Sequence, residues 1–77
     1  MPEHYDYELD TFGLACPLPI IKTKDEMKKI PEGSILKVIS SDGGVIDDMK
    51  GFCRMKGHEF LSYEINLPEY IVYIKKK

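Results

Sequence analysis

The stretch Ile35-Leu36-Lys37-Val38-Ile39 is apolar except for one lysine, and most of its residues are β-branched. Residues of this kind favour strands, and a strand that is largely apolar on both faces is typical of the middle of a sheet. The sequence therefore predicts a central strand over residues 35–39. The other elements follow outward from it, in both directions along the chain.

A helix is predicted before this strand, over residues 17–30. The segment contains no glycine, and it begins with Pro17, a residue favoured at the first helical position. Pro31-Glu32-Gly33 then ends the helix. The apolar positions expected on its buried face are Ile20, Ile21, Met27 and Ile30.

A second helix is predicted after the central strand, over residues 44–56. Asp42 lies in a turn with two glycines and is the candidate N-cap residue, since aspartate is among the preferred N-caps. Apolar residues then recur at helical spacing until Gly57, where the pattern ends.

Three outer strands complete the chain. Residues 5–10 alternate apolar or aromatic with acidic side chains until Gly13 breaks the pattern, and residues 59–66 and 70–74 read as a hairpin joined by the turn 67–69. The order is βαβαββ. This order predicts an α/β two-layer sandwich with a four-stranded mixed sheet and two helices on one face.

The composition describes one small folded domain, residues 1–77. The 11 lysine and arginine residues against 13 aspartate and glutamate residues give a net charge of −2, whereas a nucleic-acid binder needs positive charge to neutralise phosphates. No window approaches the roughly 20 apolar residues of a membrane span, and residues 1–10 do not resemble a secretory signal. We therefore expect a cytoplasmic protein that neither inserts into a membrane nor binds nucleic acid.

The two cysteines, Cys16 and Cys53, stand too far apart in sequence for a C-x-x-C pair, and two are too few for a dense disulfide framework. Two thiols and the distant His58 also fall short of the four ligands of a structural zinc site. We expect reduced thiols, no metal and no other cofactor.

Cys16 stands in the stretch Gly13-Leu14-Ala15-Cys16-Pro17-Leu18-Pro19, between a glycine turn and two prolines. If Pro17 is the first helical residue, Cys16 is the N-cap, and its sulfur lies beside the unpaired N–H groups at the positive end of the helix. A dipole contribution of about 1–2 kcal/mol would lower the thiol pKa from about 8.5 by about one unit, and the thiolate is the form that attacks sulfur. The alternative is a small buried hydrophobe followed by ordinary helix-start prolines.

The two prolines are expected to hold the helix start in place. Pro19, at the third helical position, has no N–H, so the Leu18 N–H is the expected donor to the cysteine side chain. Fewer N–H groups also leave less polar surface for a docking partner to desolvate. The predicted positioning residues of the Cys16 thiol are Gly13, Leu14, Pro17, Leu18 and Pro19.

The residues Cys16-Pro17-Leu18-Pro19 after a Gly-Leu turn resemble the CPxP signature of the TusA/SirA-like sulfur carriers. The resemblance extends over nearly the whole chain, including Pro31-Glu32-Gly33, the turn from Asp42 to Gly44, and the stretch GFCRMKGHE from Gly51 to Glu59. It implies a two-layer α/β sandwich with sulfurtransferase-type activity. In that activity Cys16 would accept sulfane sulfur as a persulfide and transfer it to an acceptor protein.

The same resemblance implies the partners. The donor would be a protein of the cysteine desulfurase or rhodanese type, or thiosulfate, and the acceptor would be another sulfur-relay protein. Family members serve tRNA thiolation, molybdenum-cofactor supply and sulfur oxidation, and some resemble partners of membrane thiosulfate transporters.

Cys53 and His58 are secondary candidates. Cys53 lies on the apolar stripe of the second predicted helix, which is typical of a packed core thiol; the alternative is a resolving cysteine that pairs with Cys16. His58 is expected to hydrogen-bond backbone or cap the helix end, with proton transfer as the alternative. A docking face or a plain solvated surface would both explain the basic residues Lys22, Lys24, Lys28, Lys29, Arg54 and Lys56.

Two further functions stay open from the sequence. One is a thiosulfate-handling partner of a membrane transporter, in which Cys16 attacks the sulfane sulfur of thiosulfate. The other is a non-catalytic regulatory or RNA-interaction module, whose RNA version the net negative charge argues against.

Overall fold

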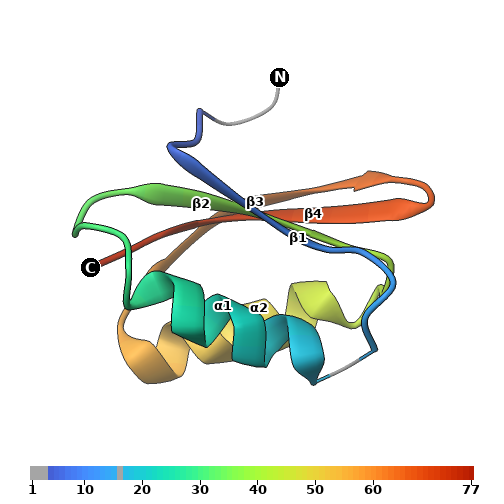
Figure 1. Cartoon of the computed structure of the whole chain (residues 1–77), viewed down its shortest axis with the longest axis horizontal. Helices are drawn as coiled ribbons and strands as arrows, with labels where there is room; N and C mark the ends of the chain where they lie inside the picture. The colour runs from blue at the N-terminus through green and yellow to red at the C-terminus, as the bar shows by residue number, and fades with distance from the viewer. Residues whose placement is uncertain (1–3, 16) are drawn as a thin grey trace.

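The computed structural model describes residues 4–15 and 17–77, so Cys16 lies outside the described residues. Both helices cover the same face of a four-stranded sheet (Figure 1), which confirms the predicted two-layer βαβαββ sandwich. The elements are β1 (Tyr7–Thr11), α1 (Leu18–Met27), β2 (Ile35–Ser40), α2 (Val45–Lys56), β3 (Glu59–Asn66) and β4 (Glu69–Lys75). Neither of these helices is long and apolar enough to span a bilayer.

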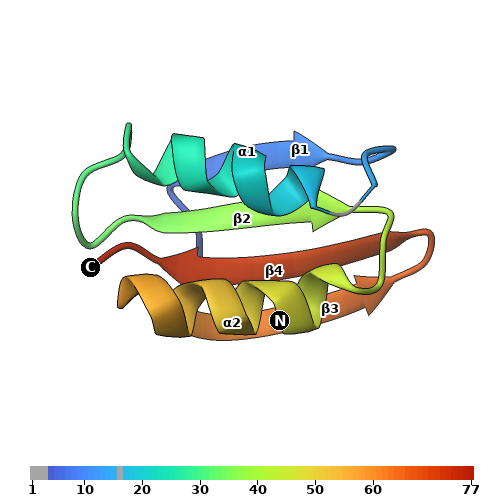
Figure 2. The same cartoon turned by 90° about the horizontal axis from the view of Figure 1, so that it is seen from below.

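The sheet has the strand order β1-β2-β4-β3, as Figure 2 shows from the helix side. β1 and β2 are parallel, and the β2–β4 and β3–β4 pairs are antiparallel. β2 is therefore a central strand, as its apolar composition predicted. α1 connects the two parallel strands, and α2 lies beside it over the other half of the sheet (Figure 2).

The main core lies between the sheet and the helices. Alternate residues of β2 and β4 face the helices because successive strand side chains point to opposite faces. They form one buried cluster with side chains from both helices and the turn after α1, whose members are Met27, Ile30, Leu36, Val38, Val45, Met49, Phe52, Cys53, Val72 and Ile74. Burial of this cluster is the main source of stability in so small a domain.

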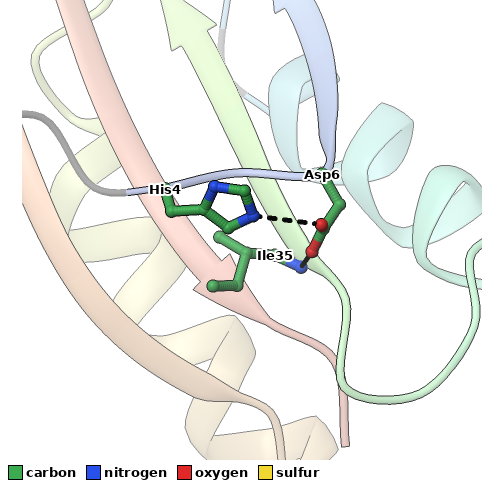
Figure 3. Close-up of polar contacts among 3 residues, drawn as sticks. All are labelled: His4, Asp6 and Ile35. Carbon is green, nitrogen blue, oxygen red and sulfur yellow. Dashed lines mark hydrogen bonds and ion pairs between the residues drawn. The ribbon is translucent and has the colours of Figure 1, made fainter.

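The N-terminal segment covers part of the other sheet face. The Tyr5 ring lies 6.3 Å from the ring of buried Tyr73, and the Lys37 ammonium lies 4.9 Å above the Tyr5 ring. Asp6 anchors the segment: its Oδ2 accepts the Ile35 N–H at 3.0 Å and its Oδ1 lies 3.3 Å from His4 Nε2 (Figure 3). The Ile35 hydrogen bond lowers the pKa of this carboxyl because it stabilises the charged form.

Several predicted boundaries were wrong, for identifiable reasons. The predicted first strand, 5–10, begins instead at Tyr7 and runs to Thr11, because its pairing with β2 starts at Tyr7 while Tyr5 turns over the open sheet face. The predicted helix 17–30 ends at Met27. Lys28 and Lys29 donate to carbonyls only three residues back, which tightens the chain before Pro31.

Other predicted roles also changed. Asp42 is not the N-cap of α2, because Gly44 occupies that position and Asp42 Oδ1 accepts the Gly44 N–H at 2.9 Å. Ile21, expected on the buried face of α1, is exposed, whereas Thr23 is buried and donates its hydroxyl to the Pro19 carbonyl at 2.8 Å. The exchange of Ile21 for Thr23 on the buried face arises because packing, not composition, decides which side of a helix faces the sheet.

Candidate functional site

The stretch that carries the CPxP residues connects β1 to α1. Its described residues lie at the end of the molecule where β1 and β2 end and both helices begin (Figure 2). Ala15 and Pro17, on either side of Cys16, are both exposed. The structure therefore brings the predicted positioning residues together at one exposed end of the sandwich.

Hydrogen bonds tie this loop to the ends of the two parallel strands. The Gly13 N–H donates to Ser41 Oγ at 2.9 Å, and the Leu14 N–H donates to the Thr11 carbonyl at 3.1 Å. Thr11 itself is buried, and its hydroxyl donates to the Ile39 carbonyl. The loop before the cysteine is thus anchored to the ends of β1 and β2.

Gly13 makes this turn with a φ of +89°, a conformation that residues with a Cβ rarely adopt. A Cβ built at Gly13 meets no atom within 4 Å, so backbone strain is the cost of the Gly13→Ala substitution. We expect it to lose about 1–2 kcal/mol of unfolding free energy. The matched control is Gly51→Ala, in the interior of α2 with equally open space, which we expect to gain about 0.5–1 kcal/mol. Urea denaturation measures both, and a destabilised Gly51→Ala or an unchanged Gly13→Ala would contradict the assignment.

The helix begins one residue later than predicted, so Cys16 is not its N-cap. Pro17 takes that position, with φ −99° and ψ 17°, and Leu18 is the first helical residue. The Leu18 N–H donates to the Ala15 carbonyl at 2.9 Å. The expected bond from Leu18 to the Cys16 side chain involves a residue outside the described part of the chain and stays a prediction.

The next N–H groups of the helix are also occupied. Pro19 is the second helical residue rather than the third, and it is buried. The Ile20 and Ile21 N–H groups both donate to the Pro17 carbonyl at 3.1 Å. The backbone donors at this helix start therefore already have acceptors. The lowered pKa expected for the Cys16 thiol concerns a residue outside the described part of the chain and stays a prediction.

Large apolar side chains are exposed around this end. Phe12 and Leu67 line a shared depression between the β1–α1 loop and the β3–β4 turn. Leu18 and Ile21 project from the first turns of α1, and the four side chains are between 43% and 70% exposed. Exposed apolar groups gathered near one loop are typical of a surface that a partner covers.

A groove of about 580 Å³ lies between the two helices and reaches Pro17. Its apolar lining includes Ile20, Phe52 and Met55, with Met55 84% exposed. Lys24 and Lys56 line it as well, as do Asp47 and Asp48 from the first turn of α2. The groove was not expected from the sequence, although Met55, an apolar residue outside the buried stripe of Met49, Phe52 and Cys53, was a signal for it.

Cys53 belongs to the core and not to the exposed loop. It is 2% exposed and packs in the main hydrophobic cluster, as its place on the apolar stripe predicted. Burial raises the pKa of its thiol to about 11, because the thiolate loses its hydration. A thiol in this state is a poor nucleophile at neutral pH.

His58 lies at the other end of α2 from the loop. Its backbone N–H donates to the Cys53 carbonyl at 2.9 Å, and its ring Nδ1 accepts the Lys77 N–H at 3.2 Å. Burial, followed by the charges of Lys76 and Lys56, lowers the pKa of the imidazole. The backbone hydrogen bonds expected from the sequence are present, and they hold His58 away from the CPxP residues.

Comparison with known proteins identifies the family. A family model described as "Sulfurtransferase TusA" matches residues 7–76. The chain belongs to the TusA family. The match includes every helix and strand of the fold together with the CPxP stretch.

Individual relatives of this TusA-family chain agree. A sulfur carrier protein TusA from Pseudomonas syringae pv. syringae is 35% identical over 72 residues, covering 94% of the chain and 86% of that protein. A relative from Aquifex aeolicus, named as a sulfur carrier, is 42% identical over 71 residues, and the chain spans only 36% of its length. A SirA-like protein from Desulfitobacterium hafniense shares the fold, with a TM-score of 0.74 at 22% identity over 91% of this chain and 96% of that one.

Proposed function

We propose that this protein is a sulfur-relay carrier in which Cys16 accepts sulfane sulfur as a persulfide and passes it to an acceptor protein. The observation that carries the proposal is the family match over residues 7–76, which includes the CPxP stretch. Further support comes from the loop itself, which is anchored to the sheet and lies at an exposed end of the domain.

The proposed chemistry consists of two thiol exchange steps. The Cys16 thiolate attacks the terminal sulfur of a donor persulfide, the donor S–S bond breaks, and the donor leaves as a thiolate. An acceptor thiolate then attacks the outer sulfur on Cys16 and releases the Cys16 thiolate. Each step exchanges one S–S bond for another, so the relay needs no external oxidant or reductant.

The surroundings of the loop suit brief docking. A carrier has to meet a donor and then an acceptor, which favours a small interface of the size found in transient complexes. Phe12, Leu18, Ile21 and Leu67 offer apolar contacts around the loop. Pro17 and Pro19 contribute no N–H groups that a partner would have to desolvate.

Two classes of donor are compatible with this chemistry. A protein of the cysteine desulfurase or rhodanese type would present the sulfur as its own persulfide. Thiosulfate would present it directly, with sulfite as the leaving group, and would connect the carrier to a membrane thiosulfate transporter. The same thiol serves both, so the donor has to be identified by experiment.

The test is intact-mass spectrometry after incubation with a cysteine desulfurase and cysteine, with a rhodanese and thiosulfate, or with thiosulfate alone. We expect a gain of one sulfur atom in at least one arm, reversed by a thiol reductant as a persulfide is. The arm that works identifies the donor class. No adduct in any arm, from protein whose Cys16 is still alkylated by iodoacetamide, would overturn the proposal and favour a non-catalytic interaction module.

A further inference from the structure

A second depression, of about 160 Å³, lies at the C-terminal ends of the two helices, beyond the groove that reaches Pro17. Its floor includes Met27 and Phe52. Its polar lining is entirely of basic types, namely Lys24, Lys28, Lys56, Lys76 and His58. We refer to these five residues as the lysine pocket.

The lysine pocket gathers positive charge in a protein whose net charge is −2. No aspartate or glutamate is among its lining residues, and the ion pairs found in the described part of the chain do not involve its lysines. Among the pocket lysines, and within residues 4–15 and 17–77, only Lys76 has a side-chain hydrogen-bond acceptor, the Ile30 carbonyl at 2.8 Å from its Nζ. The pKa of His58 is lowered first by burial and then by Lys76 and Lys56, so these charges act on the ring.

Lysines near helix C-termini also interact favourably with the helix dipole, and this alone could explain Lys24 and Lys56. It does not explain why residues from four separate places converge. Lys24 comes from α1, Lys28 from the turn after it, Lys56 from α2, and Lys76 from the chain after β4. Bringing like charges together costs free energy that a bound anion would offset.

We propose that the lysine pocket binds a multivalent oxyanion, of the class that includes sulfate, thiosulfate and phosphate. Lysine ammonium groups are point-charge donors suited to such ions. The Lys77 N–H occupies His58 Nδ1, so the neutral ring carries its proton on Nε2 and can donate one more hydrogen bond.

The lysine pocket lies toward the opposite end of the helices from the sulfur-carrying loop, although Lys24 and Lys56 also line the groove that reaches Pro17. Lys24 lies seven residues beyond Pro17, which at the helical rise corresponds to about 10 Å along α1, and Lys28 lies beyond the end of that helix. Ion binding is measured by titration and sulfur loading at Cys16 by intact mass, so the failure of either proposal can be told from the failure of the other.

The test is an NMR titration of the full chain with sodium sulfate, sodium thiosulfate or sodium phosphate, against sodium chloride at equal ionic strength. We expect saturable shifts of the amides that line the lysine pocket, with half-saturation at about 1 mM or below. The His58 ring pKa should rise on binding, because a nearby anion stabilises the imidazolium. Shifts no larger than those with chloride, for all three oxyanions, would overturn the proposal.

A pair of double variants distinguishes a specific binding site from a general effect of positive charge. Lys28→Gln combined with Lys56→Gln removes two charges from the pocket and should weaken binding about tenfold or more. Lys22→Gln combined with Lys29→Gln removes two charges from exposed lysines that do not line it and should leave the affinity unchanged. Equal affinities in the two double variants would refute a specific pocket. Similar amide dispersion would show that both double variants fold.

Discussion

The Cys16→Ser variant is expected to take up no reducible sulfur from any donor and to pass none to an acceptor, while remaining folded. A serine hydroxyl cannot form the S–S bond on which the proposed relay depends. The substitution is nearly isosteric and lies in a loop whose anchoring bonds come from Gly13, Leu14 and Thr11. Intact mass after donor treatment measures the loading, and circular dichroism checks the fold.

Cys53→Ser is the matched control for this prediction, because it removes the other thiol. With a pKa of about 11, Cys53 holds roughly 100-fold less thiolate at pH 8 than an ordinary cysteine, and burial further blocks access. Sulfur loading of Cys53→Ser should therefore match that of the wild type. Iodoacetamide should label one cysteine of the native wild type and both after unfolding. Loss of loading in Cys53→Ser, at a temperature where the variant is folded, would show that the second thiol takes part.

Met49→Ala is expected to lower the unfolding free energy by about 2–5 kcal/mol. Met49 is fully buried between α2 and the sheet, so its truncation removes apolar contacts and leaves a cavity in the main core. For a domain of this size the loss is a large part of the total stability. Urea denaturation at 25 °C measures it, with an unchanged m-value showing that the unfolding transition is the same.

Met55→Ala, on the same helix, is the control for that experiment. Met55 is 84% exposed and lines the groove between the helices rather than the core. We expect its truncation to change the unfolding free energy by no more than about 0.5 kcal/mol. Similar losses in the two variants would show that α2 does not present the face to the sheet that the structure assigns to it.

The element order and the sheet centre could be predicted from the sequence because local patterns determine them. The apolar run at 35–39 could be stable only in the middle of a sheet, and Gly33 and Gly57 mark turns that no other residue makes as easily. The helix boundaries were less accurate. The end of α1 at Met27 depends on how the chain returns to β2, and that geometry has no local signature.

The same distinction between local patterns and tertiary geometry applies to the candidate site. The CPxP residues were recognisable as a motif, and the chemistry proposed for Cys16 follows from them. The start of α1 at Leu18, with Pro17 as its N-cap and the Leu18 N–H bonded to the Ala15 carbonyl, could not be predicted from the sequence. The surfaces that a partner or an ion would use could not be predicted from the sequence either, since they combine residues that are far apart along the chain.

Local sequence patterns were thus enough to predict the βαβαββ order, the central position of β2, the core placement of Cys53 and the motif around Cys16, because each depends on residues within a few positions of one another. Which side chains share a surface could be learned only from the folded chain. Lys28 and Lys76 line one pocket because β4 pairs with β2 and brings the end of the chain beside the end of α1. Such proximity results from strand pairing and helix packing over long sequence separations, which composition and periodicity do not encode.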